Sequence, residues 1–373
     1  MSEWVNLQTL IQSIFHPISS ASLAEANAQL LSFAESKAAW YVCFELMGIS
    51  DDINIRFFVI NLIYNKIRRQ WSQLESSERP QLILHLQEIL SSSCTSSERA
   101  FVSRVILCLS CCYALSPDGI QSNIALAIDF IHFNDVLRKR TGLEMLVAVY
   151  DESEDLDVSR AGRLDIKAQL AEMAGRVFDC LNSMSAVNFF GDVQIQLYFI
   201  KASRVWCNIR GLTITSFISE YSLIWGGVYQ SLASSDSSLV IESCHLLRER
   251  ILIQEFPSTP LRVNALETLT TSILSESVIS SLFGFFKDEN QSDVMLQVSN
   301  MLTTLVENEI GYYSGVGFNI DLFHALLHCL SARPRKVGAI TFDLWLRVQD
   351  IALANRNPYL REQVFYEILE RLV

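Results

Sequence analysis

The chain has 373 residues, of which 50% are hydrophobic and 19% charged, and its formal net charge is −12 at pH 7. This composition supplies enough apolar surface for a large core and excludes a disordered chain. The acidic excess opposes direct DNA binding, because a phosphate backbone is held by a dense stripe of cations. We therefore expect no DNA binding and expect basic proteins as partners, although an acidic surface also serves solubility alone.

Length and hydropathy narrow the class further. A single core rarely grows beyond about 250–300 residues, so the chain should hold several domains or one elongated array of repeats. The mean hydropathy is +0.24, yet the longest apolar stretch, 105–115, is about half of the ~20 residues that a membrane span needs. We expect no membrane insertion. The N-terminal segment, with Glu3 near its start, is interpreted as the first helix and not as a secretory signal.

Helical periodicity dominates the chain, and no stretch sustains the period-two alternation of a strand. The seven prolines lie at or near the ends of apolar stretches, where they mark helix boundaries. Helix pairs are predicted to start near Trp4, Lys37, Arg79, Gly119, Asp165, Thr213, Arg262 and Asn319, with a last helix opening near Pro358. This spacing centres on the ~40 to 47 residues of a HEAT or armadillo repeat. The predicted fold is therefore all-α, a right-handed α-α superhelix of stacked helix pairs.

The segment 52–71 shows why such pairs must stack. Apolar or aromatic residues recur every three or four positions at Ile53, Phe57, Ile60, Tyr64, Ile67 and Trp71. On a helix these side chains form one stripe that must be buried. A polar stripe lies beside it, at Asn54, Asn61, Asn65 and Arg68. One face is expected to pack on neighbouring helices while the other meets solvent or a partner, and 99–112 repeats this arrangement.

The most polar stretch, 151–157, reads DESEDLD. We interpret it as an acidic loop formed by Asp151, Glu152, Glu154, Asp155 and Asp157. Solvation is the default role of such a charge run, and contact with a basic partner is the alternative. A second loop, 311–317 with the sequence GYYSGVG, is expected to be a flexible linker with exposed aromatics.

The segment CLSCC places Cys108, Cys111 and Cys112 at a spacing used in redox and zinc sites. A second pair of ligands and a βαβ pattern are both missing, and Cys108 and Cys112 fall on successive turns of a helix predicted to be buried. We interpret them as reduced core cysteines.

Other signatures of chemistry are also lacking. His324 and His328 are four residues apart, but Ala325 stands where metalloprotease helices carry a glutamate. No GxxxxGK[ST] phosphate loop and no GxSxG nucleophile motif occurs in the sequence. We therefore predict no metal site, no cofactor and no enzymatic activity.

Several segments together carry a family resemblance. They are VNLQTLIQSIFHP at 5–17, SKAAWYVCFEL at 36–46, and IRFFVINLIYNKIRRQW at 55–71, with its paired Phe57 and Phe58 followed by Lys66 and Ile67. Arg104, with the apolar run behind it, fits the third repeat, and 143–157 resembles a helix and acidic loop, although Val149 and Tyr150 replace the usual Leu-Pro. These segments resemble the importin-β superfamily of nuclear transport receptors, closest to its importin-13 and transportin-3 branch. The resemblance covers about residues 1 to 180 and is architectural beyond.

This resemblance implies HEAT repeats whose outer first helices touch phenylalanine-glycine nucleoporins. The inner second helices of the N-terminal repeats would hold the small GTPase Ran in its GTP form, with protein cargo along the concave surface. Residues 1–117 would be the Ran-proximal repeats and 118–373 further repeats. Such receptors shuttle between cytoplasm and nucleus and are considerably longer, so we expect this chain to be a fragment or a truncated gene model.

The resemblance also places candidate contacts for Ran. They are Arg56, Asn61, Asn65, Arg68, Arg99 and Arg104. The alternative is a merely solvated helix face, and Trp40, Phe57, Phe58 and Trp71 are interpreted as structural. Two other functions stay open: a generic helical-repeat scaffold or adaptor, and an exportin, in which Ran-GTP promotes cargo binding.

Overall fold

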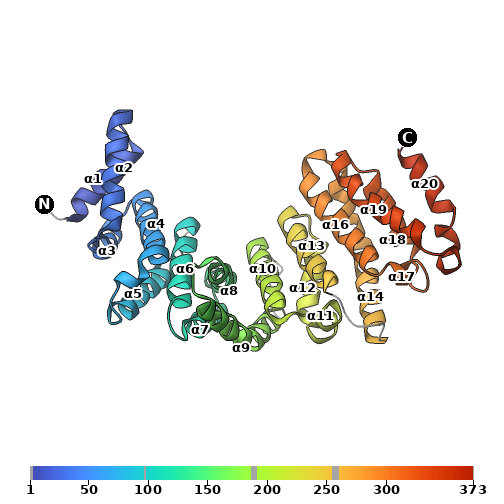
Figure 1. Ribbon diagram of the computed structural model, residues 1–373, viewed down its shortest axis with the longest axis horizontal. Helices are drawn as coiled ribbons and strands as arrows, with labels where there is room; N and C mark the ends of the chain where they lie inside the picture. Colours follow the sequence, from blue (N-terminus) through green and yellow to red (C-terminus); the bar gives the residue numbers. More distant parts are fainter. Residues whose placement is uncertain (1–2, 96–97, 186–190, 254–259, 373) are drawn as a thin grey trace. The chain divides into compact units, whose positions relative to one another are not determined.

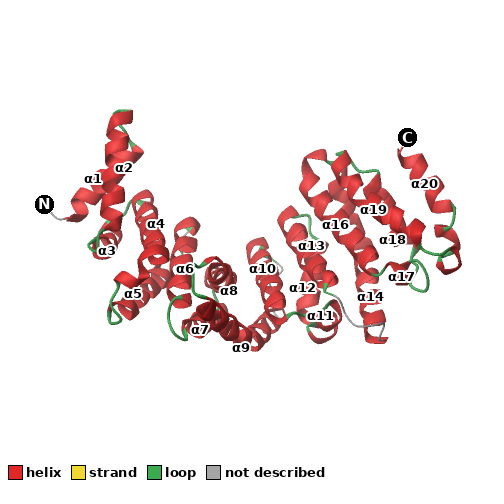
Figure 2. Cartoon of the chain, in the orientation of Figure 1, coloured by secondary structure: helices red, strands yellow, loops and turns green. Residues whose placement is uncertain are grey.

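The computed structural model describes residues 3–95, 98–185, 191–253 and 260–372 (Figure 1). The regular structure of these residues is entirely helical, with twenty α-helices and five short 3₁₀-helices (Figure 2). The chain forms two compact units, Met1–Gly175 and Arg176–Val373. The expected boundary at 117/118 divides Ran-proximal repeats from further repeats. It concerns function and not compact units, so it stays a prediction.

Unit 1 is a row of helix pairs. They are α1 (Glu3–Phe15) with α2 (Ser20–Glu35), α3 (Ala39–Ile49) with α4 (Ile53–Gln70), α5 (Glu78–Ser93) with α6 (Arg99–Ala114), and α7 (Gly119–His132) with α8 (Val136–Asp155). The 3₁₀-helix η1 (Trp71–Gln73) follows α4, and α9 (Arg160–Ser185) runs across the boundary between the units. The second helices stack in order, α4 on α6 and α6 on α8. These three helices carry most of the candidate partner contacts.

Unit 2 repeats this arrangement with bent or divided first helices. It contains α10 (Val193–Arg210), α11 (Ile214–Glu220), α12 (Ser222–Leu232), α13 (Ser237–Leu252), α14 (Pro260–Ile273), α15 (Glu276–Gly284), α16 (Ser292–Asn308), α17 (Ile310–Tyr313), α18 (Ile320–Leu330), α19 (Arg335–Asp350) and α20 (Gln363–Leu372). Four 3₁₀-helices accompany them, η2 (Phe285–Lys287), η3 (Glu289–Gln291), η4 (Leu353–Asn355) and η5 (Pro358–Leu360). The helices α10, α13, α16 and α19 stack on one another in sequence.

The predicted pair starts are confirmed to within a few residues. First helices begin at Glu3, Ala39, Glu78, Gly119, Arg160, Ile214, Pro260 and Ile320. Four second helices begin with an aspartate whose side chain accepts a hydrogen bond from a backbone N–H of the first turn: Asp52, Asp135, Asp192 and Asp236. Such caps satisfy amide groups that have no partner within the helix, so they define where each second helix starts.

The predicted stripe of the 52–71 helix is largely confirmed. Ile60, Tyr64, Ile67 and Trp71 are buried, whereas Ile53 and Phe57 are half-buried. Lys66 was not expected in the core, yet it is 6% exposed. Its ammonium group donates to the carbonyl of Ala34 at 2.8 Å and lies 5.2 Å from the Trp40 ring centroid. Burial lowers the pKa of this lysine.

The expectation for 311–317 was wrong in one respect. Tyr313 is 1% exposed, and its hydroxyl is hydrogen-bonded to the hydroxyl of Thr270 at 2.8 Å. Gly317 lies so close to the Tyr312 ring that a Cβ there would be 2.2 Å from it. The glycine therefore permits the chain to cross the ring, and the aromatics anchor this segment to the core.

Among the described residues, no single helix is long and apolar enough to cross a membrane. A bent pair, Pro260–Ile273 with Glu276–Lys287, passes the same test by length and composition only.

Candidate functional site

The candidate site is the set of polar side chains on α4, α6 and the C-terminal end of α8, called here the α4–α6–α8 face. It carries Arg56, Asn61, Asn65 and Arg68 on α4, Arg99 and Arg104 on α6, and Glu152 on α8. Asn65 is exposed, whereas the side-chain amide of Asn61 donates to the carbonyl of Phe57 in its own helix at 2.8 Å. The structure thus places the predicted residues on neighbouring second helices, α4 and α6.

Glu152 is the centre of a polar cluster that joins all three helices. Its side chain is buried, and its carboxylate accepts hydrogen bonds from the Tyr64 hydroxyl at 2.7 Å and the Cys111 thiol at 2.9 Å. Arg68 lies 3.7 Å from the same carboxylate and donates to the Tyr64 oxygen at 2.8 Å. A buried carboxylate with these donors is well satisfied, so the cluster holds α4, α6 and α8 together.

A second cluster joins α6 to α8. Arg99 donates to the carboxylate of Glu144 at 2.8 Å, and these side chains are only 17% and 10% exposed. Ser103 donates to the other oxygen of that carboxylate. Arg99 also donates to the hydroxyl of Thr141 at 3.3 Å. Arg56 is similarly engaged: it lies 3.4 Å from Glu98.

Arg104 has a different environment. Its guanidinium carbon lies 4.7 Å from the centroid of the Tyr64 ring, a cation–π arrangement. The side chain is half-buried. In the part of the chain that the structure describes, no carboxylate is within ion-pair distance of Arg104. It is therefore the arginine of this face whose charge is not matched by a paired acid.

The Tyr64 hydroxyl and the thiols of α6 hold their protons tightly. Burial, together with the hydrogen bond to Glu152, raises the pKa of Tyr64 to about 12. Burial and then the neighbouring Glu152 charge raise the pKa of the Cys111 thiol far above its ordinary value. Burial does the same for Cys108 and Cys112. A thiol held in this form is a poor nucleophile, so the cluster is suited to holding helices and not to covalent chemistry.

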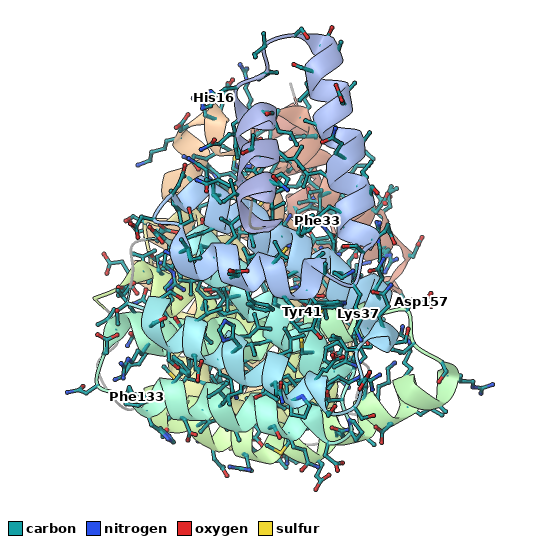
Figure 3. The ribbon with its side chains drawn as sticks, turned by 90° about the vertical axis from the view of Figure 1, so that its left-hand side faces the viewer. His16, Phe33, Lys37, Tyr41, Phe133 and Asp157 are labelled. Atoms are coloured by element: carbon teal, nitrogen blue, oxygen red, sulfur yellow. The ribbon has the colours of Figure 1, made fainter. Side chains whose placement is uncertain are left out.

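The acidic segment 151–157 was expected to be a loop, and this was wrong. Residues 151–155 form the last turn of α8, and Glu152 is buried. The other four, Asp151, Glu154, Asp155 and Asp157, are exposed, and Asp157 lies at the edge of the unit (Figure 3). Whether they contact a basic partner stays a prediction.

Arginines explain why this acidic turn remains helical. Acidic side chains near the C-terminus of a helix are repelled by the negative end of the helix dipole and destabilise the last turn. Arg68 donates to the carbonyl of Asp155 at 3.0 Å, and Arg163 donates to the carbonyls of Glu154 and Leu156 at 3.0 and 2.7 Å. Two cations from α4 and α9 thus satisfy the last carbonyls of α8 and offset the repulsion.

The cysteines were interpreted as reduced residues of the core, and their burial agrees with this. All nine are free and buried, and no group of three His, Cys, Asp or Glu residues that could hold a metal occurs among the described residues. His324 and His328 turn to different neighbours. His324 lies 4.0 Å from Glu367, whereas His328 makes an edge contact with Phe283, with ring centroids 4.4 Å apart.

The acidic partners Glu98 and Glu144 were missed at the sequence level, although a signal was present. Arg56 and Glu98 are separated by 42 residues, and Arg99 and Glu144 by 45. In unit 2, Arg204 and Glu249 are also 45 apart. Each separation is about one repeat length. A base on one second helix and an acid one repeat later therefore meet where these helices stack.

Comparison with known proteins gave no matching family model. The chain is 21% identical over 208 residues to importin-13 homolog A of Dictyostelium discoideum, a match that covers 53% of this chain and 19% of that protein. Its fold is similar to a solved structure described as importin-13 in its cytosolic state, with a TM-score of 0.57, 14% identity, and coverage of 85% of this chain and 36% of the other. The chain thus spans well under half the length of either protein. In sequence and in fold it is similar to importin-13, which confirms both the resemblance to the importin-β superfamily and the all-α helical-repeat fold.

Proposed function

We propose that the protein is a nuclear transport receptor of the importin-13 type, which carries protein cargo through nuclear pores under the control of Ran-GTP. The observation that carries this proposal is that the chain is similar in sequence to an importin-13 homolog and in fold to a solved importin-13. The protein then acts by binding and not by catalysis, and it shuttles between cytoplasm and nucleus.

The α4–α6–α8 face is the proposed site for Ran-GTP. It lies on second helices, which are the helices the family resemblance assigns to the GTPase. The face offers an exposed amide at Asn65, a half-buried guanidinium at Arg104 and an exposed carboxylate at Asp155. Such mixed polar surfaces give specificity through matched charges and hydrogen bonds. Basic cargo is proposed to use acidic groups, including Asp151, Glu154, Asp155 and Asp157.

The first helices offer a different kind of surface, proposed here for phenylalanine-glycine nucleoporins. A groove of about 970 Å³ lies between α5 and α7. Apolar side chains along it include Ile83, Leu84 and Leu126. Leu84 is 57% exposed, and apolar side chains exposed on the wall of a groove can contact a phenylalanine side chain.

Control of cargo binding by Ran-GTP would depend on changes in helix stacking that pass from one repeat to the next. Each helix pair contacts chiefly its neighbours, so a small change in the stacking of second helices alters the spacing along the array. Ran-GTP on these helices favours one spacing and cargo favours another, and the two ligands then oppose each other's binding. The gradient of Ran-GTP across the nuclear envelope gives the direction.

The test is binding of the full chain to Ran locked in its GTP or GDP form. We expect retention of the GTP form with little retention of the GDP form, and release of bound cargo by Ran-GTP. A generic scaffold would bind neither form or both equally, which contradicts the proposal. An exportin would bind the GTP form but hold cargo more tightly in its presence, so the cargo arm distinguishes import from export.

A further inference from the structure

The arginines of the α4–α6–α8 face fall into two groups with different roles. Arg56, Arg68 and Arg99 each face a carboxylate of this chain, at 3.4, 3.7 and 2.8 Å. Their side chains are 24%, 30% and 17% exposed. A partner that took Arg68 or Arg99 would leave the buried carboxylate of Glu152 or Glu144 without its counter-ion, which opposes such binding.

These three arginines are braces between helices. Arg99 and Arg68 reach from their own helix to α8, and Arg56 reaches from α4 to Glu98, which immediately precedes α6. Removing one should loosen the stack of second helices. Its effect on a partner would be indirect, through the position of the helices.

Arg104 lies among the braces but, among the described residues, it is not paired with a carboxylate as they are. Its guanidinium is held against the Tyr64 ring at 4.7 Å, and Tyr64 is itself fixed by its bonds to Glu152 and Arg68. A guanidinium held over a ring keeps its N–H donors in its own plane, where they can receive a planar carboxylate. The side chain is thus oriented before any partner binds, which lowers the entropic cost of binding.

Resting on the proposed function, we infer that Arg104 is the anchoring cation of the Ran site and receives a single carboxylate of the GTPase. Arg56, Arg68 and Arg99 position the helices around it. A single unmatched guanidinium suits one carboxylate. The exposed acids at the end of α8, such as Asp151 and Asp155, repel a continuous polyanion such as nucleic acid.

The chain offers a matched control for this role. Arg138 lies over the Phe133 ring, 4.5 Å from its centroid, in the same kind of contact as Arg104. Phe133 precedes α8 and Asp157 follows it, and the two residues lie on opposite sides of the unit in Figure 3. Arg138→Gln therefore removes an equivalent cation–π contact at the end of α8 away from the acidic turn.

The experiment measures the affinity of the full chain for Ran carrying a non-hydrolysable GTP analogue. We expect Arg104→Gln to weaken binding about tenfold to a hundredfold, the range of an interfacial arginine anchor, and to reduce its salt dependence. Arg104→Lys should fall between, because it keeps the charge but loses the planar fork. Arg138→Gln should bind within about twofold of the unchanged chain.

Circular dichroism and the melting temperature provide the second readout. Arg104→Gln should retain helicity and melt close to the unchanged chain, whereas Arg68→Gln and Arg99→Gln should melt lower. Binding by Arg104→Gln at unchanged affinity would overturn the inference while the proposed function stands. A greater loss of affinity in folded Arg68→Gln or Arg99→Gln than in Arg104→Gln would also overturn it. If the unchanged chain does not distinguish GTP from GDP forms, the proposed function and this inference fall together.

Discussion

The hydroxyl of Tyr64 on α4 donates a 2.7 Å hydrogen bond to the carboxylate of Glu152 on α8, across 88 residues of sequence. These helices belong to pairs that are not adjacent along the chain, since α5 and α6 lie between them. Repeats ordinarily contact only their neighbours. The bond therefore shows that side chains of α4 and α8 meet across α6, and it makes Glu152 a residue on which the geometry of the proposed Ran site depends.

Replacing Glu152 tests this dependence. Glu152→Gln leaves Arg68 without its counter-ion inside the cluster, so we expect unit 1 to be destabilised by about 1–3 kcal/mol. The measurement is the denaturant midpoint, together with hydrogen exchange of α4 and α8. Glu154→Gln is the control, because the Glu154 side chain is 41% exposed and its ion pair with Lys167, at 3.9 Å, is long. This variant should change the free energy of unfolding by no more than about 0.5 kcal/mol. Equal effects of the two variants would show that the cluster does not hold the helices.

Alkaline pH should weaken the same contact. The pKa of Tyr64 is raised to about 12, above the ~10 of an unfolded tyrosine. The folded state therefore holds this proton more tightly, and its contribution to stability is complete below about pH 10 and is lost as the pH rises through about 12. Stability of Tyr64→Phe should decline less steeply across that window. Parallel declines of the two proteins, followed by circular dichroism, would contradict the assignment.

The cysteines should be inert in the folded protein. All nine are buried, and burial raises the pKa of Cys43 to about 12. At pH 8 almost no thiolate is present at such a site, and the thiolate is the reactive form. A thiol-specific reagent should label none of the nine in the native protein and all nine after unfolding, as counted by mass spectrometry. Rapid native labelling at Cys108, Cys111 or Cys112 would instead indicate a reactive site.

Two helical glycines should respond oppositely to alanine. A Cβ at Gly142 would lie 2.5 Å from the carbonyl oxygen of Ala127, between α7 and α8, whereas a Cβ at Gly175 meets nothing within 4 Å. Gly142→Ala should destabilise the protein by about 1–3 kcal/mol through overpacking. Gly175→Ala should stabilise it by about 0.5–1 kcal/mol, because alanine favours a helix. Thermal melts of the two variants give the comparison, and a stabilised Gly142→Ala would refute the close packing.

Local features of the sequence were sufficient for the helix pairs and for the burial of their apolar stripes. Aspartates such as Asp52 and Asp192 define helix starts through bonds to nearby amides, and the stripe through Ile60 and Ile67 has the period of one helix face. Both depend on neighbours within about two turns, which is the range that a sequence pattern reports. The resemblance to the importin-β superfamily could be drawn from the same segments.

Only the tertiary structure decided which charges are free. Arg68 and Arg104 look alike in the sequence, and both guanidinium groups lie over the Tyr64 ring. Only Arg68 also faces the carboxylate of Glu152. The acidic run at 151–157 likewise reads as a loop until Arg68 and Arg163 are found on its carbonyls. These contacts join residues brought together by the stacking of one pair on another. Their energy depends on distance and burial, and neither is written in the order of residues along the chain.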